Sequence, residues 1–338
     1  MSVSRKRTAR NASDAPMDAV TAINAQKNKK RKSGEEIHLI FSFRCDRILL
    51  KGGAFMKIST TIGGAVKVIG HHKAVEYCAK AGFDAWDMAL STLYSDGIGT
   101  EIDVPGYNGN FLKLIKELKA IGLDNGIYCN QTHAPDPVKV DKSEYAMKKS
   151  IEFTAELGAK ICVVHPGTRI PAEPNVEFFS KLMPFAKEYG VKLAVENMWD
   201  WDTKISRAFF CNCATPESYL EHILPVNDDH FVACLDIGHA EMMGDLTNAK
   251  DIIYALGDRI EALHIHDNDK IHDNHVIPFS MNIDYPPIIK ALKDVGYKGD
   301  FTLECSYHVA NCTEDNILQA FTEMAEADRK LARMFEEA

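Results

Sequence analysis

Eight short apolar segments alternate along this chain with amphipathic stretches of helical length, and no other feature of the sequence restricts the fold as much. The segments predicted as strands cover residues 57–62, 85–90, 126–132, 160–165, 192–197, 232–237, 260–266 and 300–305. The predicted helices cover residues 72–81, 111–121, 143–157, 176–189, 216–223, 250–256, 285–295 and 316–335. Alternating strands and helices favour a parallel sheet, and eight such units predict its closure into a single α/β domain, the (β/α)8 or TIM barrel.

Glycines mark the expected ends of these helices. A glycine follows a helical stretch at six places, where the left-handed backbone that ends a helix favours this residue: Gly82, Gly122, Gly158, Gly190, Gly257 and Gly296. An open doubly wound sheet is the alternative fold, but no Gly-x-Gly-x-x-Gly motif follows the first strand. Gly63-Gly64 at that position predicts only a turn.

Residues 1–55 differ in character from the rest of the chain. They contain the basic runs 5–7 and 29–32 and few apolar periodicities. One interpretation is a nucleic-acid-binding or targeting arm. We favour a disordered extension, or sequence translated upstream of the native start, because the ordered pattern begins immediately after Met56. We therefore expect an extension, 1–55, and a barrel domain, 56–338. The intact mass of protein purified from its source tests this, and a product retaining residues 1–55 would contradict a start at Met56.

The balance of charge and the cysteine spacing narrow the class of protein. A formal net charge of -9 argues against a nucleic-acid partner unless a local basic patch exists. No run of about 18 apolar residues is present, so we expect no membrane partner, and no signal-peptide pattern opens the chain. The nine cysteines show neither paired nor zinc-ribbon spacing. These features predict reduced cysteines and a cytoplasmic protein. The oligomeric state stays open, a homo-oligomer included.

Imidazoles and carboxylates gather at the ends of the later predicted strands. Six of them stand at strand ends: His133, His165, Glu196, Asp236, His266 and Glu304. His239 follows the sixth strand, and Asp273 and His275 follow the seventh. Barrel enzymes carry their chemistry at this end of the strands. Each residue alone is more often a structural hydrogen-bonding group, but three carboxylates buried at one mouth call for a balancing cation. The pattern predicts a divalent metal ion, Mn, Zn, Co or Mg, and leaves open more than one.

His264 and His266 stand two residues apart on the seventh strand. Side chains alternate along a strand, so both should point toward the barrel axis, with His264 deeper and His266 nearer the mouth. We expect His266 to bind the metal and His264 to support the ligands from below.

These residues resemble the xylose isomerase-like TIM barrel superfamily, in its sugar phosphate isomerase/epimerase branch and its endonuclease IV branch, from about Met56 to the C-terminus. The first branch implies one divalent metal held by Glu196, Asp236, His266 and Glu304. Its Asp-x-x-His motif matches Asp236 and His239, with His239 on the substrate. The resemblance also implies that Glu196 and Glu304 form an acid/base pair.

The expected reaction is sugar isomerisation or epimerisation, by proton transfer alpha to a carbonyl through a metal-stabilised enediolate. The substrate would be a small sugar, phosphorylated or not. Further candidate substrate-binding residues lie after strands 4 and 5. Trp199 and Trp201 could wall the pocket against a sugar face, Arg207 could meet an anionic group, and His165 could contact the substrate.

The rival interpretation is an endonuclease IV-like phosphodiesterase that acts on abasic DNA. That branch uses a larger ligand set, and the resemblance assigns His165-Pro-Gly, Asp273-Asn-His275 and His133 to it. His239 is a further candidate ligand. Residues 1–55 contain many of the basic residues of the whole chain, so the barrel alone is more acidic than the chain as a whole. This negative charge weighs against DNA as the substrate.

Overall fold

The computed structural model describes residues 55–90, 111–136, 143–242 and 247–338. The proposed extension 1–55 lies almost wholly outside these residues. The eight predicted strands are all present, each close to its expected position: β1 (Ile58–Thr60), β2 (Ala85–Ala89), β3 (Tyr128–His133), β4 (Ile161–Val164), β5 (Lys192–Glu196), β8 (Phe231–Asp236), β9 (Ile260–His264) and β10 (Phe301–Leu303).

These strands form one closed parallel ring. Strands β2, β3, β4, β5, β8 and β9 pair in that order, and β1 pairs with β10. Two parallel bridges, Thr61 with Asp87 and Ile265 with Leu303, join the two sheets. The predicted (β/α)8 barrel is therefore confirmed, and all strands deliver their C-terminal ends to one mouth.

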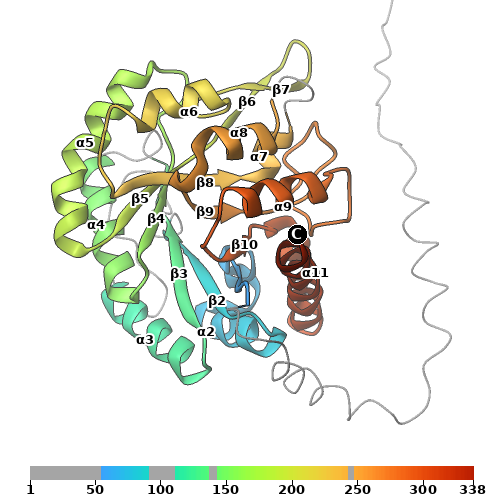
Figure 1. Ribbon diagram of the computed structural model, residues 1–338. Helices are drawn as coiled ribbons and strands as arrows, with labels where there is room; N and C mark the ends of the chain where they lie inside the picture. Colours follow the sequence, from blue (N-terminus) through green and yellow to red (C-terminus); the bar gives the residue numbers. More distant parts are fainter. Residues whose placement is uncertain (1–54, 91–110, 137–142, 243–246) are drawn as a thin grey trace, which may run out of the picture. The chain divides into compact units, whose positions relative to one another are not determined.

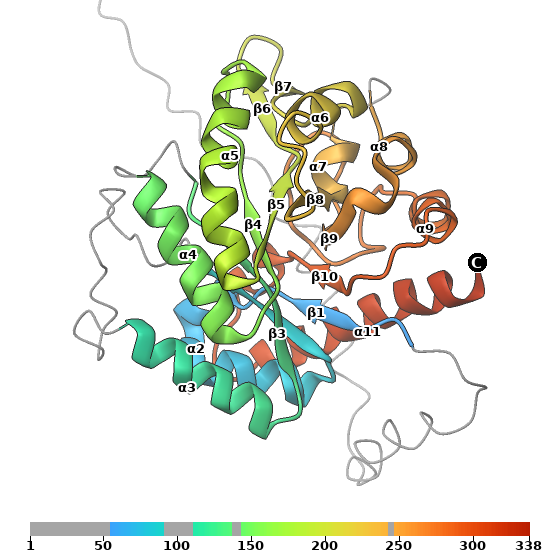
Figure 2. The ribbon, with the colours of Figure 1, turned by 60° about the vertical axis from the view of Figure 1, so that its left-hand side comes forward.

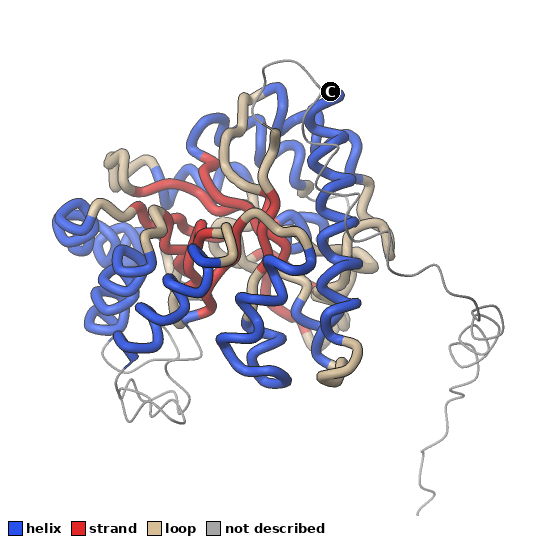
Figure 3. Tube along the Cα trace, turned by 90° about the horizontal axis from the view of Figure 1, so that it is seen from below, coloured by secondary structure: helices blue, strands red, loops and turns tan. Residues whose placement is uncertain are grey.

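Helices surround the strands on the outside, as the view from below shows (Figure 3). The long ones are α2 (Gly63–Ala81), α3 (Phe111–Asp124), α4 (Ser143–Leu157), α5 (Ala172–Tyr189), α9 (Tyr285–Asp294) and α11 (Ile317–Glu337). The short ones are α6 (Pro216–Ile223), α7 (Ile237–Glu241), α8 (Ala249–Leu256), the 3-10 turn η5 (Gly257–Arg259) and α10 (Ser306–Ala310). None of the helices in the described residues is both long and apolar enough to cross a membrane.

Two glycine predictions were wrong. Gly63 and Gly64 begin helix α2 instead of forming a turn, and a side chain at Gly64 would meet the backbone of Ser306 at 3.0 Å. Gly122 lies inside α3, where a Cβ would come within 3.0 Å of Trp86 Nε1. Gly126, beyond the helix, takes the left-handed conformation instead, with φ 77°. At Gly82 and Gly190 the left-handed helix end is present as expected.

The loop expected after the fifth strand is instead an antiparallel hairpin, β6 (Trp199–Asp202) and β7 (Arg207–Phe210). Two tryptophans alternate with aspartates along β6, which places both indoles on one face of the hairpin.

The interior of the barrel is layered beneath the mouth. Outward-facing strand residues join the helices in the main apolar core, whereas a second, smaller core contains Val163, Ala194, Val232, Cys234 and Ala262. Four of these lie two residues before His165, Glu196, Asp236 and His264 respectively. Because alternate residues share one face of a strand, each of these four small apolar residues supports a polar residue directly above it.

Candidate metal centre and active site

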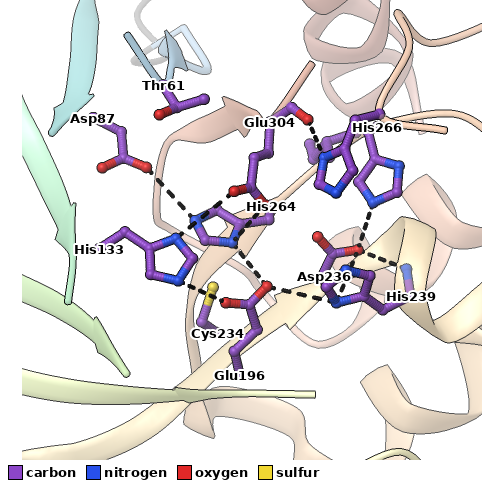
Figure 4. A network of polar contacts seen from close by, with 12 residues as sticks. Thr61, Asp87, His133, Glu196, Cys234, Asp236, His239, His264, His266 and Glu304 are labelled. Atoms are coloured by element: carbon purple, nitrogen blue, oxygen red, sulfur yellow. Dashed lines mark hydrogen bonds and ion pairs between the residues drawn. The ribbon is translucent and has the colours of Figure 1, made fainter. Parts of the chain in front are cut away.

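Four side chains from four strand ends converge at the barrel mouth. Glu196, Asp236, His264 and Glu304 each offer a ligand atom, and these atoms lie within 4.8 Å of one another. His264 lies at the centre, with Nδ1 3.0 Å from Glu196 Oε1 and 3.4 Å from Glu304 Oε2 (Figure 4). We call this set the inner ligand group. Three of its members are those predicted from the sequence, but its histidine is His264, which we had expected only to support the ligands.

His266 belongs to a second set with His239, Asp273 and His275, the outer ligand group. Its ring stacks on that of His275, with centroids 4.0 Å apart, and His275 Nε2 lies 2.9 Å from Asp273 Oδ2. Asp236 links the two groups, since its Oδ1 lies 3.2 Å from His266 Nε2. Both histidines thus enter the mouth as expected, but each faces a different set of partners.

His133 and His165 complete the pocket on the side of β3 and β4. Their Nε2 atoms lie 2.8 Å apart, so one donates a hydrogen bond to the other. Glu196 Oε2 lies 3.5 Å from His133 and 3.2 Å from His165. His133, Glu196 and His264 form a third possible ligand set. Glu196 is therefore the carboxylate that His133, His165 and His264 share.

The acidic groups of the pocket favour the protonated, positively charged forms of His264 and His239. Burial alone would lower the pKa of His264, but Cys234, Glu196 and Glu304 raise it well above the usual value. Burial also opposes charge on His239, and Asp236 and Asp273 raise its pKa in the same way. For Glu196, burial would raise the pKa, yet the adjacent histidines hold it well below the usual range. Burial raises the pKa of Glu304.

A divalent cation fits these donors. Asp236 Oδ2, Asp273 Oδ1 and His266 Nδ1 are buried without a hydrogen-bond partner in the described part of the chain. Buried polar atoms are nearly always satisfied, so unsatisfied carboxylate oxygens beside imidazoles indicate an ion. The inner group, with three carboxylates and one imidazole, suits borderline and hard divalent ions.

The predicted substrate-binding residues are only partly brought together. Trp199 approaches His239 edge-on, with ring centroids 6.5 Å apart, and Trp201 stacks on His272 at 5.5 Å. The hairpin thus forms an aromatic wall near the outer ligand group. Arg207 is exposed on β7 opposite Asp202, and it joins none of the three ligand sets.

Three residues that sequence reasoning missed help to build the site. Asp87 is fully buried in the middle of β2, and its Oδ2 lies 3.6 Å from His264 Nε2 (Figure 4). Asn197, directly after Glu196, contacts both Asp236 and His239. Gly238 lies so close to the His266 ring that any side chain there would overlap it. A buried aspartate in an otherwise apolar strand was the one visible signal for Asp87.

The local structure after β8 explains the Asp-Ile-Gly-His motif. Asp236 is the N-cap of α7, and its Oδ1 accepts a hydrogen bond of 2.6 Å from the His239 backbone. The cap turns the chain so that His239 returns over the mouth.

Comparisons with known proteins agree with this architecture. Residues 75–333 match the family model described as xylose isomerase-like TIM barrel. A protein of Methanocaldococcus jannaschii, itself described as uncharacterised, is 29% identical over 250 residues, covering 68% of this chain and 78% of the relative.

Two solved structures share the fold. A D-tagatose 3-epimerase-like protein is 23% identical with a TM-score of 0.63, over 83% of this chain and 99% of that chain. The IolI protein with a bound zinc atom is 20% identical with a TM-score of 0.62, over 83% of this chain and 99% of that chain.

Proposed function

The chain belongs to the xylose isomerase-like TIM barrel family, and we propose that it is a divalent-metal-dependent isomerase or epimerase of a small sugar. One observation carries the proposal: Glu196 and Glu304, from strand ends on either side of β9, both approach His264 Nδ1, at 3.0 Å and 3.4 Å. Two carboxylates from different strands, with oxygens that converge within 4.8 Å of one another, can serve the two faces of one substrate carbon. A solved structure of the same fold, that of a D-tagatose 3-epimerase-like protein, supports this choice.

In the proposed reaction, one glutamate removes the proton from the carbon next to a carbonyl and the other returns a proton. Return to the opposite face of that carbon gives an epimer, and return to the neighbouring carbon gives the aldose–ketose isomer. A divalent ion, when bound, supplies Lewis-acid polarisation of the carbonyl. The inner ligand group would hold it, with His266 beside Asp236 as the alternative imidazole. Glu304 is the better placed base, because its side chain is 18% exposed and that of Glu196 is fully buried.

The remaining candidates would bind the substrate. We assign His239 and His165 to sugar hydroxyls, and Trp199 and Trp201 to an apolar face of the sugar. Arg207 remains a candidate for a negatively charged group at the rim, where it is exposed.

The test is a panel of ketoses incubated with the metal-loaded enzyme in deuterated water. Incorporation of deuterium at the carbon next to the carbonyl, together with a new epimer or isomer, is the expected result. No exchange with any sugar of the panel would overturn the proposal.

A second function has one observation in its favour. The outer ligand group and the pair His133–His165 together offer ligands for more ions than one acid/base reaction requires. Several ions are typical of phosphodiesterases, so an endonuclease IV-like activity on abasic DNA is the second candidate. Metal-dependent incision of a duplex with one abasic site would favour it over the isomerase.

A further inference from the structure

His222 is a buried histidine outside the pocket, in helix α6. Its side chain contacts two asparagines and one backbone carbonyl. His222 Nδ1 lies 2.7 Å from the Ser218 carbonyl oxygen, and Nε2 lies 3.2 Å from Asn175 Nδ2 and 3.1 Å from Asn212 Nδ2. His222, Asn175 and Asn212 are 3%, 4% and 8% exposed. These three residues form a closed polar cluster, the His222 cluster.

Backbone partners determine which atoms of this cluster donate. The Ser218 carbonyl can only accept, so His222 carries its proton on Nδ1. The Gly167 N–H donates to Asn175 Oδ1 at 2.7 Å, and Asn175 Nδ2 donates to the Gly167 carbonyl at 3.3 Å. Asn212 Nδ2 donates to the Ile170 carbonyl at 2.9 Å. Both amide groups therefore present N–H to His222, and its Nε2 accepts from both.

The two asparagines belong to neighbouring walls of the pocket, which follow the adjacent strands β4 and β5. Asn175 holds Gly167, which follows His165 by two residues in the loop after β4. The backbone carbonyl of Asn212 accepts a hydrogen bond of 3.2 Å from the N–H of Met198, the residue directly before Trp199. Helices α5 and α6 pack against each other, and in Figure 2 the β6–β7 hairpin that carries this second wall lies at their upper end. One imidazole nitrogen thus adds a shared link between the wall that carries His165 and the wall that carries the tryptophans, beside the bond from Asn212 to Ile170 and the ion pair of Arg169 with Asp200.

We propose that His222 is a positioning residue of the active site, whose Nε2 acts as the shared acceptor that fixes the His165 loop against the Trp199–Trp201 hairpin. Its effect on turnover rests on the isomerase or epimerase activity proposed above, but its effect on the two walls does not. A displacement of about 1 Å in groups around a substrate can lower a rate by about a hundredfold, so loss of this acceptor should reduce kcat.

Two substitutions test the roles of the two imidazole nitrogens separately. In H222Q, the side-chain oxygen can take the place of Nε2 and accept from both asparagines. In H222N, the side-chain amide can take the place of Nδ1 and donate to Ser218, but Asn175 and Asn212 lose their acceptor. His230→Asn is the matched control, because His230 precedes β8 at the end of the barrel away from the mouth. Hydrogen exchange of the metal-loaded protein in peptides 165–172 and 197–212 gives a readout independent of activity.

We expect H222N to accelerate exchange in both peptides and to lower kcat about tenfold to a hundredfold. H222Q and His230→Asn should keep the exchange of the wild type. Wild-type exchange in H222N would overturn the proposal, and so would accelerated exchange with kcat unchanged. Equal acceleration in H222Q and H222N would assign the effect to packing instead of the acceptor, which also overturns it. If the wild type converts no sugar, the proposed function fails, and the exchange data still decide whether His222 joins the walls.

Discussion

Asn197 and Asp236 are joined by a reciprocal pair of hydrogen bonds across neighbouring strands. The Asn197 side chain donates to the Asp236 carbonyl at 2.9 Å and accepts from the Asp236 N–H at 2.7 Å. The Asn197 carbonyl accepts in turn from His239 Nδ1 at 2.9 Å. This pair holds the backbone of Asp236 without use of its carboxylate, whose Oδ2 stays available to a metal ion.

Asn197→Ala should therefore weaken both the fold and the metal site. It removes two buried hydrogen bonds and leaves backbone groups unpaired, which costs about 1–3 kcal/mol for each unsatisfied group. Denaturant unfolding of the metal-free protein measures the loss of stability, and titration with a divalent ion measures the loss of affinity. Asn125→Ala, at an exposed helix end where the side chain meets only the Ile121 carbonyl, is the control. Unchanged metal affinity in Asn197→Ala would show that the pair does not hold Asp236 for binding.

Glu304→Gln should abolish turnover and leave the fold intact. The amide keeps the shape of the side chain but cannot take up a proton, and loss of a general acid or base lowers rates by about 10² to 10⁴-fold. The measurement is exchange of the α-proton of a ketose that the wild-type enzyme converts, and thermal unfolding checks that the variant is folded. Glu177→Gln, an exposed change in α5, serves as the comparison. An active Glu304→Gln enzyme would reject the acid/base role.

The inner and outer ligand groups should lose metal separately. His264→Ala removes a ligand of the inner group, and of the third set with His133 and Glu196, but none of the outer group, whereas Asp273→Ala removes one of the outer group only. If both groups bind, elemental analysis should show one ion fewer in each variant than in the wild type. A bound ion also stabilises the folded state, so chelation should lower the Tm of the wild type more than that of either variant. Full metal content in His264→Ala would return the fourth ligand position to His266, as the sequence had indicated.

Asp328 makes stability depend on pH in a defined direction. This residue of α11 is fully buried, and burial raises its pKa well above the usual value despite the nearby Arg329. The protonated form therefore suits the folded state. The contribution of Asp328 to the stability of the folded state is complete below the unfolded pKa of about 3.9. It is lost as the pH rises through the pKa of Asp328 in the folded state.

Asp328→Asn should consequently be more stable than the wild type near neutral pH, by about 1.4 kcal/mol for each unit by which the pKa is raised. The gain should shrink as the pH approaches 4. Denaturant unfolding at about pH 5 and about pH 8, both above the unfolded pKa, checks the trend, with the exposed Asp124→Asn as the control. An equal difference at both pH values would contradict it.

The sequence was sufficient for the barrel and for the collection of ligands at its mouth. Strand patterning and alternation act locally, so β5, β8 and β9 appear where expected and Glu196, Asp236 and His264 share the inward face. The division of labour between His264 and His266 could not be predicted, because it depends on which carboxylates from other strands face each ring.

Asp87 and the β6–β7 hairpin were missed for related reasons. Asp87 acquires its meaning only through β9, far away in the sequence, and a single aspartate within a strand has no periodic signature. The hairpin pairs two four-residue segments, Trp-Asp-Trp-Asp and Arg-Ala-Phe-Phe, that lack the alternation of apolar and polar residues typical of a half-buried strand. It also follows a strand at a place where barrels ordinarily have a loop. Arg207, read as a substrate contact from its place after strand 5, lies on that hairpin and stays a prediction.

His264 ends β9 and His266 follows it by two residues, and this spacing has a consequence for how such a site can change over generations. Two residues along a strand span about 6.6 Å whatever their side chains are, so the peptide backbone, and not the ligands, sets the separation of the inner and outer groups. Single substitutions can remove one group or restore it, yet none can alter the gap between them. A lineage with this barrel can thus gain or lose either histidine in one step while the position available to the other remains the same.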